Sequence, residues 1–99
     1  MKTDIKPYLV EYLGNEIEVV HHSNRNNEGK SGIVFHESRR MFTIAGKSKV
    51  KIPKHTGIFR IKQDSSTFLI EGDAILMRPE DRLKNQRKIL KTLSRRCNY

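Results

Sequence analysis

The feature that most constrains this chain is a series of short runs in which apolar and polar residues alternate. The clearest example covers 42–52, where alternation continues on both sides of the turn AGKS at 45–48. A period of two sends successive side chains to opposite faces of a strand, so Val50 and Ile52 are expected to face a core. Gly46 can adopt the positive φ that a tight hairpin turn requires. The sequence therefore predicts a β-hairpin with one buried face.

Six such runs are separated by polar or glycine-containing turns. They predict strands at residues 15–20, 32–37, 42–45, 50–52, 58–62 and 68–72, with 74–77 continuing or replacing the last one. Short strands joined by tight links pair most simply as antiparallel neighbours, and closing the sheet removes its exposed edges. The predicted fold class is therefore mainly β, a small antiparallel β-barrel of about six strands.

Two flanking segments have helical periodicity instead. Residues 7–13 begin with proline, repeat apolar side chains three and four residues apart and precede a glycine, which predicts a short N-terminal helix. Residues 79–95 begin with proline and two acids, which predicts a basic C-terminal helix with a thin stripe of Leu83, Leu90 and Leu93. This helix either packs its stripe on the barrel or becomes ordered only on RNA or a partner. The sequence leaves both interpretations open.

The length of 99 residues fits one domain. We expect a flexible N-terminus at 1–6, the barrel with its N-terminal helix at 7–77, and the basic helix and tail at 78–99. The single cysteine, Cys97, cannot form an internal disulfide. The first residues lack the pattern of a secretory signal, so the expected location is cytoplasmic.

Basic charge is concentrated in two segments. The net charge is +9, and residues 39–54 and 78–99 each contribute +6, whereas the remainder is acidic. Segregated positive charge is typical of proteins that bind a polyanion, most often nucleic acid. Lysines on an edge strand can also serve only to prevent aggregation. A membrane surface is the competing polyanion, but no apolar run approaches the ~20 residues of a membrane span, and no membrane partner is expected.

The residue types that usually carry enzyme or metal chemistry form no recognisable motif. His21 and His22 are adjacent, which places them on opposite faces of a strand, and one cysteine is too few for a typical zinc site. Glu71 and Asp73 are close in sequence, but paired carboxylates are common in turns. We expect no cofactor on this chain and no catalysis by the chain alone.

Taken together, several segments resemble the archaeal ribonuclease P protein component 1 family, the counterpart of a eukaryotic ribonuclease P and MRP subunit. The resemblance runs from about Leu9 to Arg87. It rests on LGNEIEVV at 13–20, GKSGIVFHESRRMFTI at 29–44, VKIPK at 50–54, IFR at 58–60 and IEGDAIL at 70–76. The most specific segment is RPEDR at 78–82, directly after a short predicted strand.

The resemblance implies an Sm-like barrel of strongly bent antiparallel strands, flanked by terminal helices. It also implies a non-catalytic subunit of the ribonucleoprotein that removes 5′ leaders from precursor tRNA, in which the RNA subunit holds Mg2+ and carries the chemistry. The implied partners are the ribonuclease P RNA, a zinc-ribbon protein subunit, other ribonuclease P proteins and, indirectly, precursor tRNA. The matched positions that the resemblance makes RNA-facing are Arg39, Arg40, Lys51, Lys54, Arg78 and Arg82.

Charge alone extends this RNA-binding set, and apolar character suggests a second kind of surface. The additional RNA-binding candidates are Lys47, Lys49, Arg87 and Lys88. The predicted N-terminal helix is apolar, and its Glu11 would repel phosphate, so we expect it to cap the barrel or join the interface with the zinc-ribbon subunit. The residues predicted to make that protein contact are Tyr8, Leu9, Tyr12 and Leu13.

Two other functions remain alternatives. A ribosomal or other Sm-like RNA-binding protein would explain the charge but not RPEDR. A protein-interaction adaptor would dock through its N-terminal helix and keep its basic residues as a solubilising surface. The salt dependence of RNA binding distinguishes the adaptor from the RNA-binding proteins, because each neutralised phosphate releases counterions.

Overall fold

Six strands form one antiparallel sheet in the computed structural model, which describes the backbone of residues 5–97 and the side chains of residues 5–94. The strands are β1 (Glu16–His21), β2 (Ser31–Glu37), β3 (Met41–Ala45), β4 (Lys49–Pro53), β5 (Ile58–Gln63) and β6 (Ser66–Glu71). Their order across the sheet is β4-β3-β2-β1-β5-β6. All six predicted strands are confirmed, each to within two residues of its predicted bounds. Most of the N-terminus expected to be flexible, residues 1–4, lies outside the described residues.

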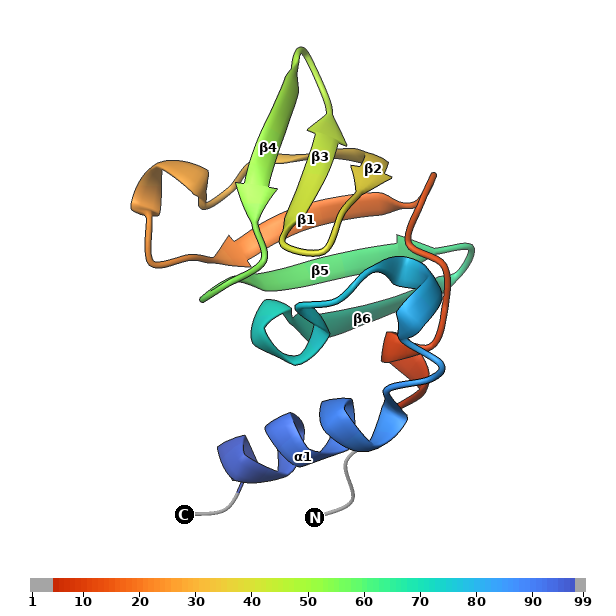
Figure 1. The fold of residues 1–99 in the computed structure, drawn as a ribbon. Helices are drawn as coiled ribbons and strands as arrows, with labels where there is room; N and C mark the ends of the chain where they lie inside the picture. The colour runs from red at the N-terminus through yellow and green to blue at the C-terminus, as the bar shows by residue number, and fades with distance from the viewer. Residues whose placement is uncertain (1–4, 98–99) are drawn as a thin grey trace.

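The sheet does not close into the predicted barrel. Its edge strands, β4 and β6, are not paired with each other anywhere in residues 5–97. After β6 the chain turns into the 3-10 helix η3 (Gly72–Ile75), so the alternative of a strand over 74–77 is wrong and nothing in the described chain is left to pair with β4. Register shifts in β1 and β2 bend the sheet. Figure 1 shows the β3–β4 hairpin rising away from β5 and β6 as a result.

A backbone contact at Gly72 joins the ends of the bent sheet. The Gly72 N–H donates a hydrogen bond of 2.8 Å to the carbonyl oxygen of Gly57. A Cβ atom at position 72 would overlap the carbonyl oxygen of Lys54, so this approach requires glycine. Because Lys54 and Gly57 belong to the connection between β4 and β5, that connection packs directly on the end of β6.

The N-terminal segment is not the predicted helix over 7–13. Only the 3-10 turn η1 (Lys6–Tyr8) is present, and the chain beyond it runs irregularly to β1. Two buried tyrosines hold the segment in this path: the Tyr12 hydroxyl donates to Pro7 O at 2.8 Å, and the Tyr8 hydroxyl accepts from the Glu71 N–H at 3.0 Å. These bonds, one within the segment and one to β6, outweigh a helical propensity that is weak in so short a segment.

The C-terminal helix begins later than predicted, and of the predicted stripe only Leu93 is buried. Helix α1 spans Gln86–Cys97, and the 3-10 turn η4 (Pro79–Asp81) precedes it. Among its described side chains, Ile89 and Leu93 are buried, and the helix packs on η3. Leu83, before the helix, is 62% exposed, and Leu90 is also exposed. The interpretation in which the helix packs on the domain is thus the one the structure supports. A further 3-10 turn, η2 (Arg25–Asn27), lies in the β1–β2 loop.

The core lies on the concave side of the sheet and is centred on aromatic residues. The Phe42 ring packs edge-on against Phe59 at 5.1 Å between centroids and against Tyr12 at 6.0 Å. Ile52 is fully buried and Val50 is half-buried, so the predicted inward face of the hairpin is confirmed. The turn is different, because Gly46 does not have a positive φ; its lack of a side chain instead allows a close approach to the Ser31 carbonyl.

Burial of the tyrosine hydroxyls predicts a loss of stability in alkali. Burial raises the pKa of Tyr12, although the Arg82 guanidinium opposes the shift, and burial also raises the pKa of Tyr8. Above about pH 10 the unfolded chain releases these protons and the folded chain does not, so the free energy of unfolding falls by up to about 1.4 kcal/mol per pH unit for each tyrosine. Tyr12→Phe should make this slope shallower in urea unfolding at a series of alkaline pH values. Parallel slopes for the two proteins would contradict this explanation.

Candidate nucleic-acid interface

Arg39 and Arg40 project from a tight turn between β2 and β3 whose backbone is held from both sides. Within the turn, Ser38 N donates to Met41 O at 2.9 Å and Met41 N donates to the Ser38 hydroxyl at 3.2 Å. From outside the turn, Lys54 N donates to Arg40 O at 2.8 Å. The two arginine side chains are exposed. The turn therefore presents two free guanidinium groups on a fixed backbone.

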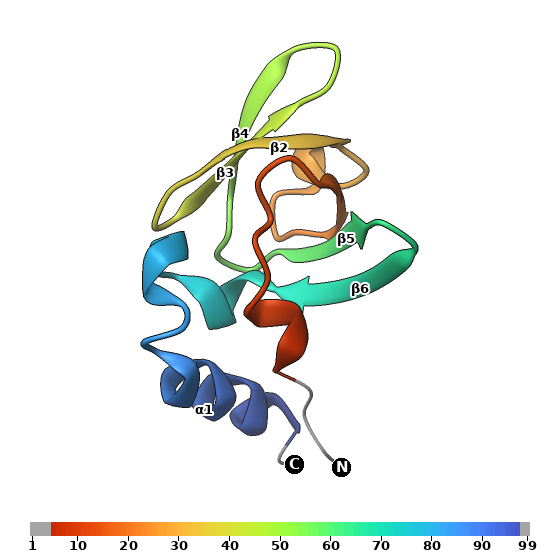
Figure 2. The same ribbon diagram turned by 90° about the vertical axis from the view of Figure 1, so that its right-hand side faces the viewer.

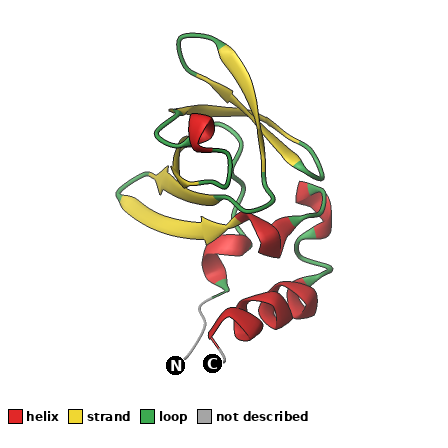
Figure 3. Ribbon diagram, turned by 90° about the vertical axis from the view of Figure 1, so that its left-hand side faces the viewer, coloured by secondary structure: helices red, strands yellow, loops and turns green. Residues whose placement is uncertain are grey.

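Three surface hollows meet at Arg39 and bring other segments to it. Arg78, at the start of η4, lines the first; Lys88 of α1 lines the second; Arg40 and His55 line the third. Figures 2 and 3 show why these segments meet, because the β2–β3 turn lies beside η4. We call Arg39, Arg40, Arg78 and Lys88 the Arg39 cluster.

Within residues 5–94, the basic side chains of the Arg39 cluster are not paired with acids, although Glu80 lines the first hollow. All four side chains are exposed, and none forms a hydrogen bond or ion pair with the part of the chain that the structure describes. Two acids, Asp73 and Asp81, line the second hollow, but Asp73 is already engaged by His55 at 2.7 Å. A cluster of free cations on a rigid surface is suited to binding phosphate groups.

The remaining lysines of the basic segment form a separate group at the β3–β4 hairpin. Lys47, Lys49 and Lys51 are exposed, and we call them the hairpin cluster. Pairing of Ala45 with Lys49 places this part of the hairpin toward its tip, and Figure 1 shows the tip at the opposite end of the molecule from α1. The exposed basic residues of segment 39–54 therefore form two separate clusters.

An exposed aromatic ring accompanies the hairpin cluster. Phe35 lies at the register shift between Val34 and His36, and it is 53% exposed. The Lys49 ammonium lies 3.7 Å from the centroid of its ring. Phe35 follows the buried Val34, so alternation along the strand points it outward, and as the extra residue of β2 it has no partner opposite it on β3.

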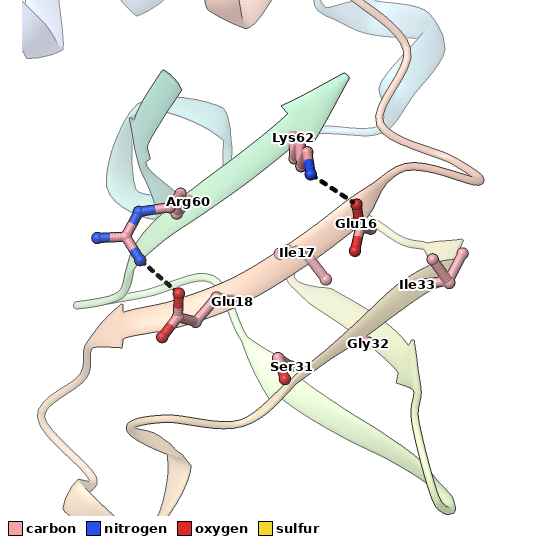
Figure 4. Close-up of a pocket in the computed structure, with 8 residues that line it drawn as sticks. All are labelled: Glu16, Ile17, Glu18, Ser31, Gly32, Ile33, Arg60 and Lys62. Carbon is pink, nitrogen blue, oxygen red and sulfur yellow. Dashed lines mark hydrogen bonds and ion pairs between the residues drawn. The ribbon is translucent and has the colours of Figure 1, made fainter. Parts of the chain in front are cut away.

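Other basic residues on the sheet are neutralised by neighbouring acids. On the outer face, Arg60 pairs with Glu18, and Lys62 lies 3.8 Å from Glu16. Figure 4 shows both pairs bridging β1 and β5 at the rim of a shallow hollow. This surface carries no excess charge, whereas unpaired basic side chains among the described residues are exposed in the Arg39 and hairpin clusters and elsewhere in loops and on α1.

Lys54 and Arg82 were predicted to face RNA, but both are buried around Glu37. Lys54 Nζ donates to Glu37 Oε2 at 2.8 Å, to Ile75 O at 3.0 Å and to Met77 O at 3.1 Å. Arg82 Nη1 donates to the same Glu37 oxygen, and Nη2 donates to Val10 O at 3.0 Å. We call Glu37, Lys54 and Arg82 the buried triad. Their charges are used inside the protein and are not available to a ligand.

Burial of the triad changes the ionisation of Lys54 and brings Arg82 against an aromatic ring. Burial lowers the pKa of Lys54, and the neighbouring Glu37 carboxylate opposes that shift. The Arg82 guanidinium stacks 4.1 Å from the centre of the Tyr12 ring. Glu37 Oε1 is buried and has no hydrogen-bond partner among the described residues. Glu37 points inward because it follows the bulge in β2. The sequence pattern does not reveal that bulge, so it does not indicate this arrangement.

The predicted protein-contact residues are mostly internal. Tyr8 and Tyr12 are buried, Leu9 is half-buried, and only Leu13 is exposed. Arg87 is exposed on α1, two residues from the buried Ile89 and so on the opposite side of the helix from the core. It lines none of the hollows that meet at Arg39.

Across residues 5–97, no helix has the length and apolar character needed to cross a membrane. The same residues contain no group of three or more His, Cys, Asp or Glu side chains arranged to hold a metal ion.

Known proteins are similar to this chain in sequence and in fold. Residues 8–85 match the family model described as Ribonuclease P/MRP, subunit p29. A protein named Ribonuclease P protein component 1 from Thermoplasma acidophilum is 40% identical over 89 residues, which cover 89% of this chain and 98% of that protein. The protein of the same name from Thermoplasma volcanium is 42% identical over 87 residues, covering 87% of this chain and 94% of the relative.

A solved structure titled "Structure of Mth11: A homologue of human RNase P protein Rpp29" is similar to this fold. It superposes with a TM-score of 0.58 at 25% sequence identity, covering 73% of this chain and 96% of that one.

Proposed function

The chain belongs to the ribonuclease P/MRP subunit p29 family, and from that membership we propose that it is a non-catalytic RNA-binding subunit of ribonuclease P. In this role it acts on precursor tRNA only indirectly, through the ribonucleoprotein that removes the 5′ leader. The RNA subunit supplies the chemistry and the Mg2+. The proposed partners of the chain are the ribonuclease P RNA, a zinc-ribbon protein subunit and other proteins of the same particle.

The observation that carries this proposal is the concentration of free basic side chains in the Arg39 cluster. Ion-paired residues such as Arg60 have part of their affinity for phosphate offset by a neighbouring carboxylate. None of the four residues of the cluster forms an ion pair among residues 5–94, although Glu80 and Asp81 line the same hollows. The four residues come from the β2–β3 turn, the start of η4 and α1. Phosphate contacts of this kind fix position and orientation on a folded RNA without reading its sequence.

Removing this charge should weaken RNA binding and its dependence on salt together. For Arg39→Ala combined with Arg40→Ala, we expect the slope of log K against log[salt] to decrease by roughly 0.7 to 0.9 for each phosphate that the variant no longer neutralises. The measurement is a salt titration of binding to the ribonuclease P RNA from the same source, with thermal unfolding as the check on the fold. Lys49→Ala combined with Lys51→Ala tests the hairpin cluster in the same way.

Arg60→Ala is the matched control, because it removes an exposed arginine that is paired with Glu18. Its salt slope should stay close to that of the unmodified protein. If neither the Arg39 and Arg40 substitutions nor the Lys49 and Lys51 substitutions change the affinity or the slope, both clusters are only solvated surface and the RNA-binding role proposed here is wrong.

A further inference from the structure

We infer that the buried triad is a set of positioning residues for RNA binding, which holds the β2–β3 turn and the Arg78 segment in the relative placement that a folded RNA requires. This inference rests on the proposed function. It assigns to Arg82, Lys54 and Glu37 a role other than direct contact, because their side chains are buried. Each triad member is anchored next to a segment that carries an exposed arginine.

The triad fixes the β2–β3 turn at both of its ends. Glu37 is the last residue of β2 and precedes Arg39 by two positions. Lys54 binds the Glu37 carboxylate through its ammonium group and the Arg40 carbonyl through its backbone N–H. A single residue therefore secures the chain immediately before and immediately after the exposed guanidinium groups.

The triad also fixes the segment that carries Arg78. Lys54 Nζ donates to the carbonyl of Met77, which directly precedes Arg78, and the guanidinium of Arg82 closes the segment on its other side by binding Glu37. Glu37 itself lines the hollow that lies between the β2–β3 turn and Arg78–Glu80. Arg78 and Arg39 thus approach the same ligand from two segments that share one internal anchor.

Stability alone does not explain why charged residues occupy this place. Replacing a buried ion pair or triad with well-packed apolar residues often leaves stability unchanged or increases it. What such residues cannot supply is directional bonding, here to the carbonyls of Ile75, Met77 and Val10. Buried Glu37 Oε1 lacks a partner among the described residues, so the arrangement is also not the one that maximises hydrogen bonding.

The test is a triple variant that keeps the fold and removes the anchors: Glu37→Leu, Lys54→Met and Arg82→Met. We expect it to unfold cooperatively near the temperature of the unmodified protein. It should bind the ribonuclease P RNA at least about tenfold more weakly, because misplacing the phosphate-binding groups reduces their contributions to binding together. Arg78→Ala should weaken binding strongly in the unmodified protein and much less in the triple variant. This non-additivity is the readout that a purely structural role would not change.

Each outcome decides the inference. Full RNA affinity in a folded triple variant, or additive effects with Arg78→Ala, would overturn it while leaving the RNA-binding role intact. A lack of effect of Arg39→Ala and Arg78→Ala in the unmodified protein would instead overturn the proposed function. If the triple variant does not fold, Arg82→Lys takes its place and is combined with Arg78→Ala in the same way. Lysine keeps the charge but cannot bind both Glu37 and Val10 O. Additive effects of Arg82→Lys and Arg78→Ala also reject the inference.

Discussion

Replacing Glu37 by glutamine is expected to lower the free energy of unfolding by about 3–5 kcal/mol, because it leaves two buried cations without their anion. Lys54 is fully buried and Arg82 nearly so, and both ion pairs are made to one carboxylate oxygen. Glutamine fills the same volume, so the loss reports charge rather than packing. Urea unfolding at neutral pH measures it.

Glu18→Gln is the matched control, because it removes the same charge from an exposed pair with Arg60. Exposed pairs contribute up to about 1 kcal/mol, so a much smaller loss is expected. Equal losses for the two substitutions would show that the carboxylate of Glu37 is not the centre of a strongly coupled buried group.

Substituting Gly72 by alanine is the second change expected to have a large effect. The new Cβ would overlap the Lys54 carbonyl oxygen and lie 2.6 Å from its carbon, and backbone atoms cannot turn aside as a flexible side chain can. The end of β6 would have to separate from the β4–β5 connection and break the bond from Gly72 N to Gly57 O. We expect a decrease of at least about 3 kcal/mol in the free energy of unfolding, measured in urea, which is in the upper range for single substitutions.

Gly29→Ala provides the comparison, since Gly29 has a φ of +84° and a methyl group added there would meet no atom within 4 Å. There the cost is the backbone strain alone, about 1 kcal/mol. A decrease at position 72 no larger than this would mean that the sheet ends separate without penalty.

The strands could be predicted from the sequence because each is short, alternating and bounded by turn residues. Val50 and Ile52 lie on the core side of the hairpin as expected. The bulge in β2 could not be predicted, because it changes no residue type in the pattern. Its effects are large: Phe35 is left without a partner on β3, and Glu37, which strict alternation from Val34 would place outward, becomes buried.

The candidate site was predictable in part. The four residues of the Arg39 cluster are exposed and line hollows that meet at Arg39, as the concentration of basic charge suggested. Lys54 and Arg82 have the same charge and lie in the same segments, yet they are buried. Composition cannot separate these two groups, because the difference depends on a carboxylate that the fold brings between them.

The two ends of the chain were predicted least well, since their helical periodicity competes with tertiary contacts. Tyr8 and Tyr12 have helical spacing, but both hydroxyls are bound to specific backbone groups that a continuous helix would not satisfy. The family resemblance is confirmed by the match over residues 8–85. The barrel that it implied is not, because β4 and β6 remain unpaired in residues 5–97.

The strand order has a consequence for how the molecule folds. β2, β3 and β4 form one local meander, and β5 and β6 form a hairpin, so both can assemble by closing short loops. β1 joins them, and its pairing with β5 brings together residues such as Val19 and Phe59, which are about 40 residues apart in the sequence. That pairing carries the largest loop-closure entropy of any in the described sheet. Folding is therefore expected to be limited by the docking of two preformed halves across β1, with a transition state in which Val19 and Phe59 already make native contacts.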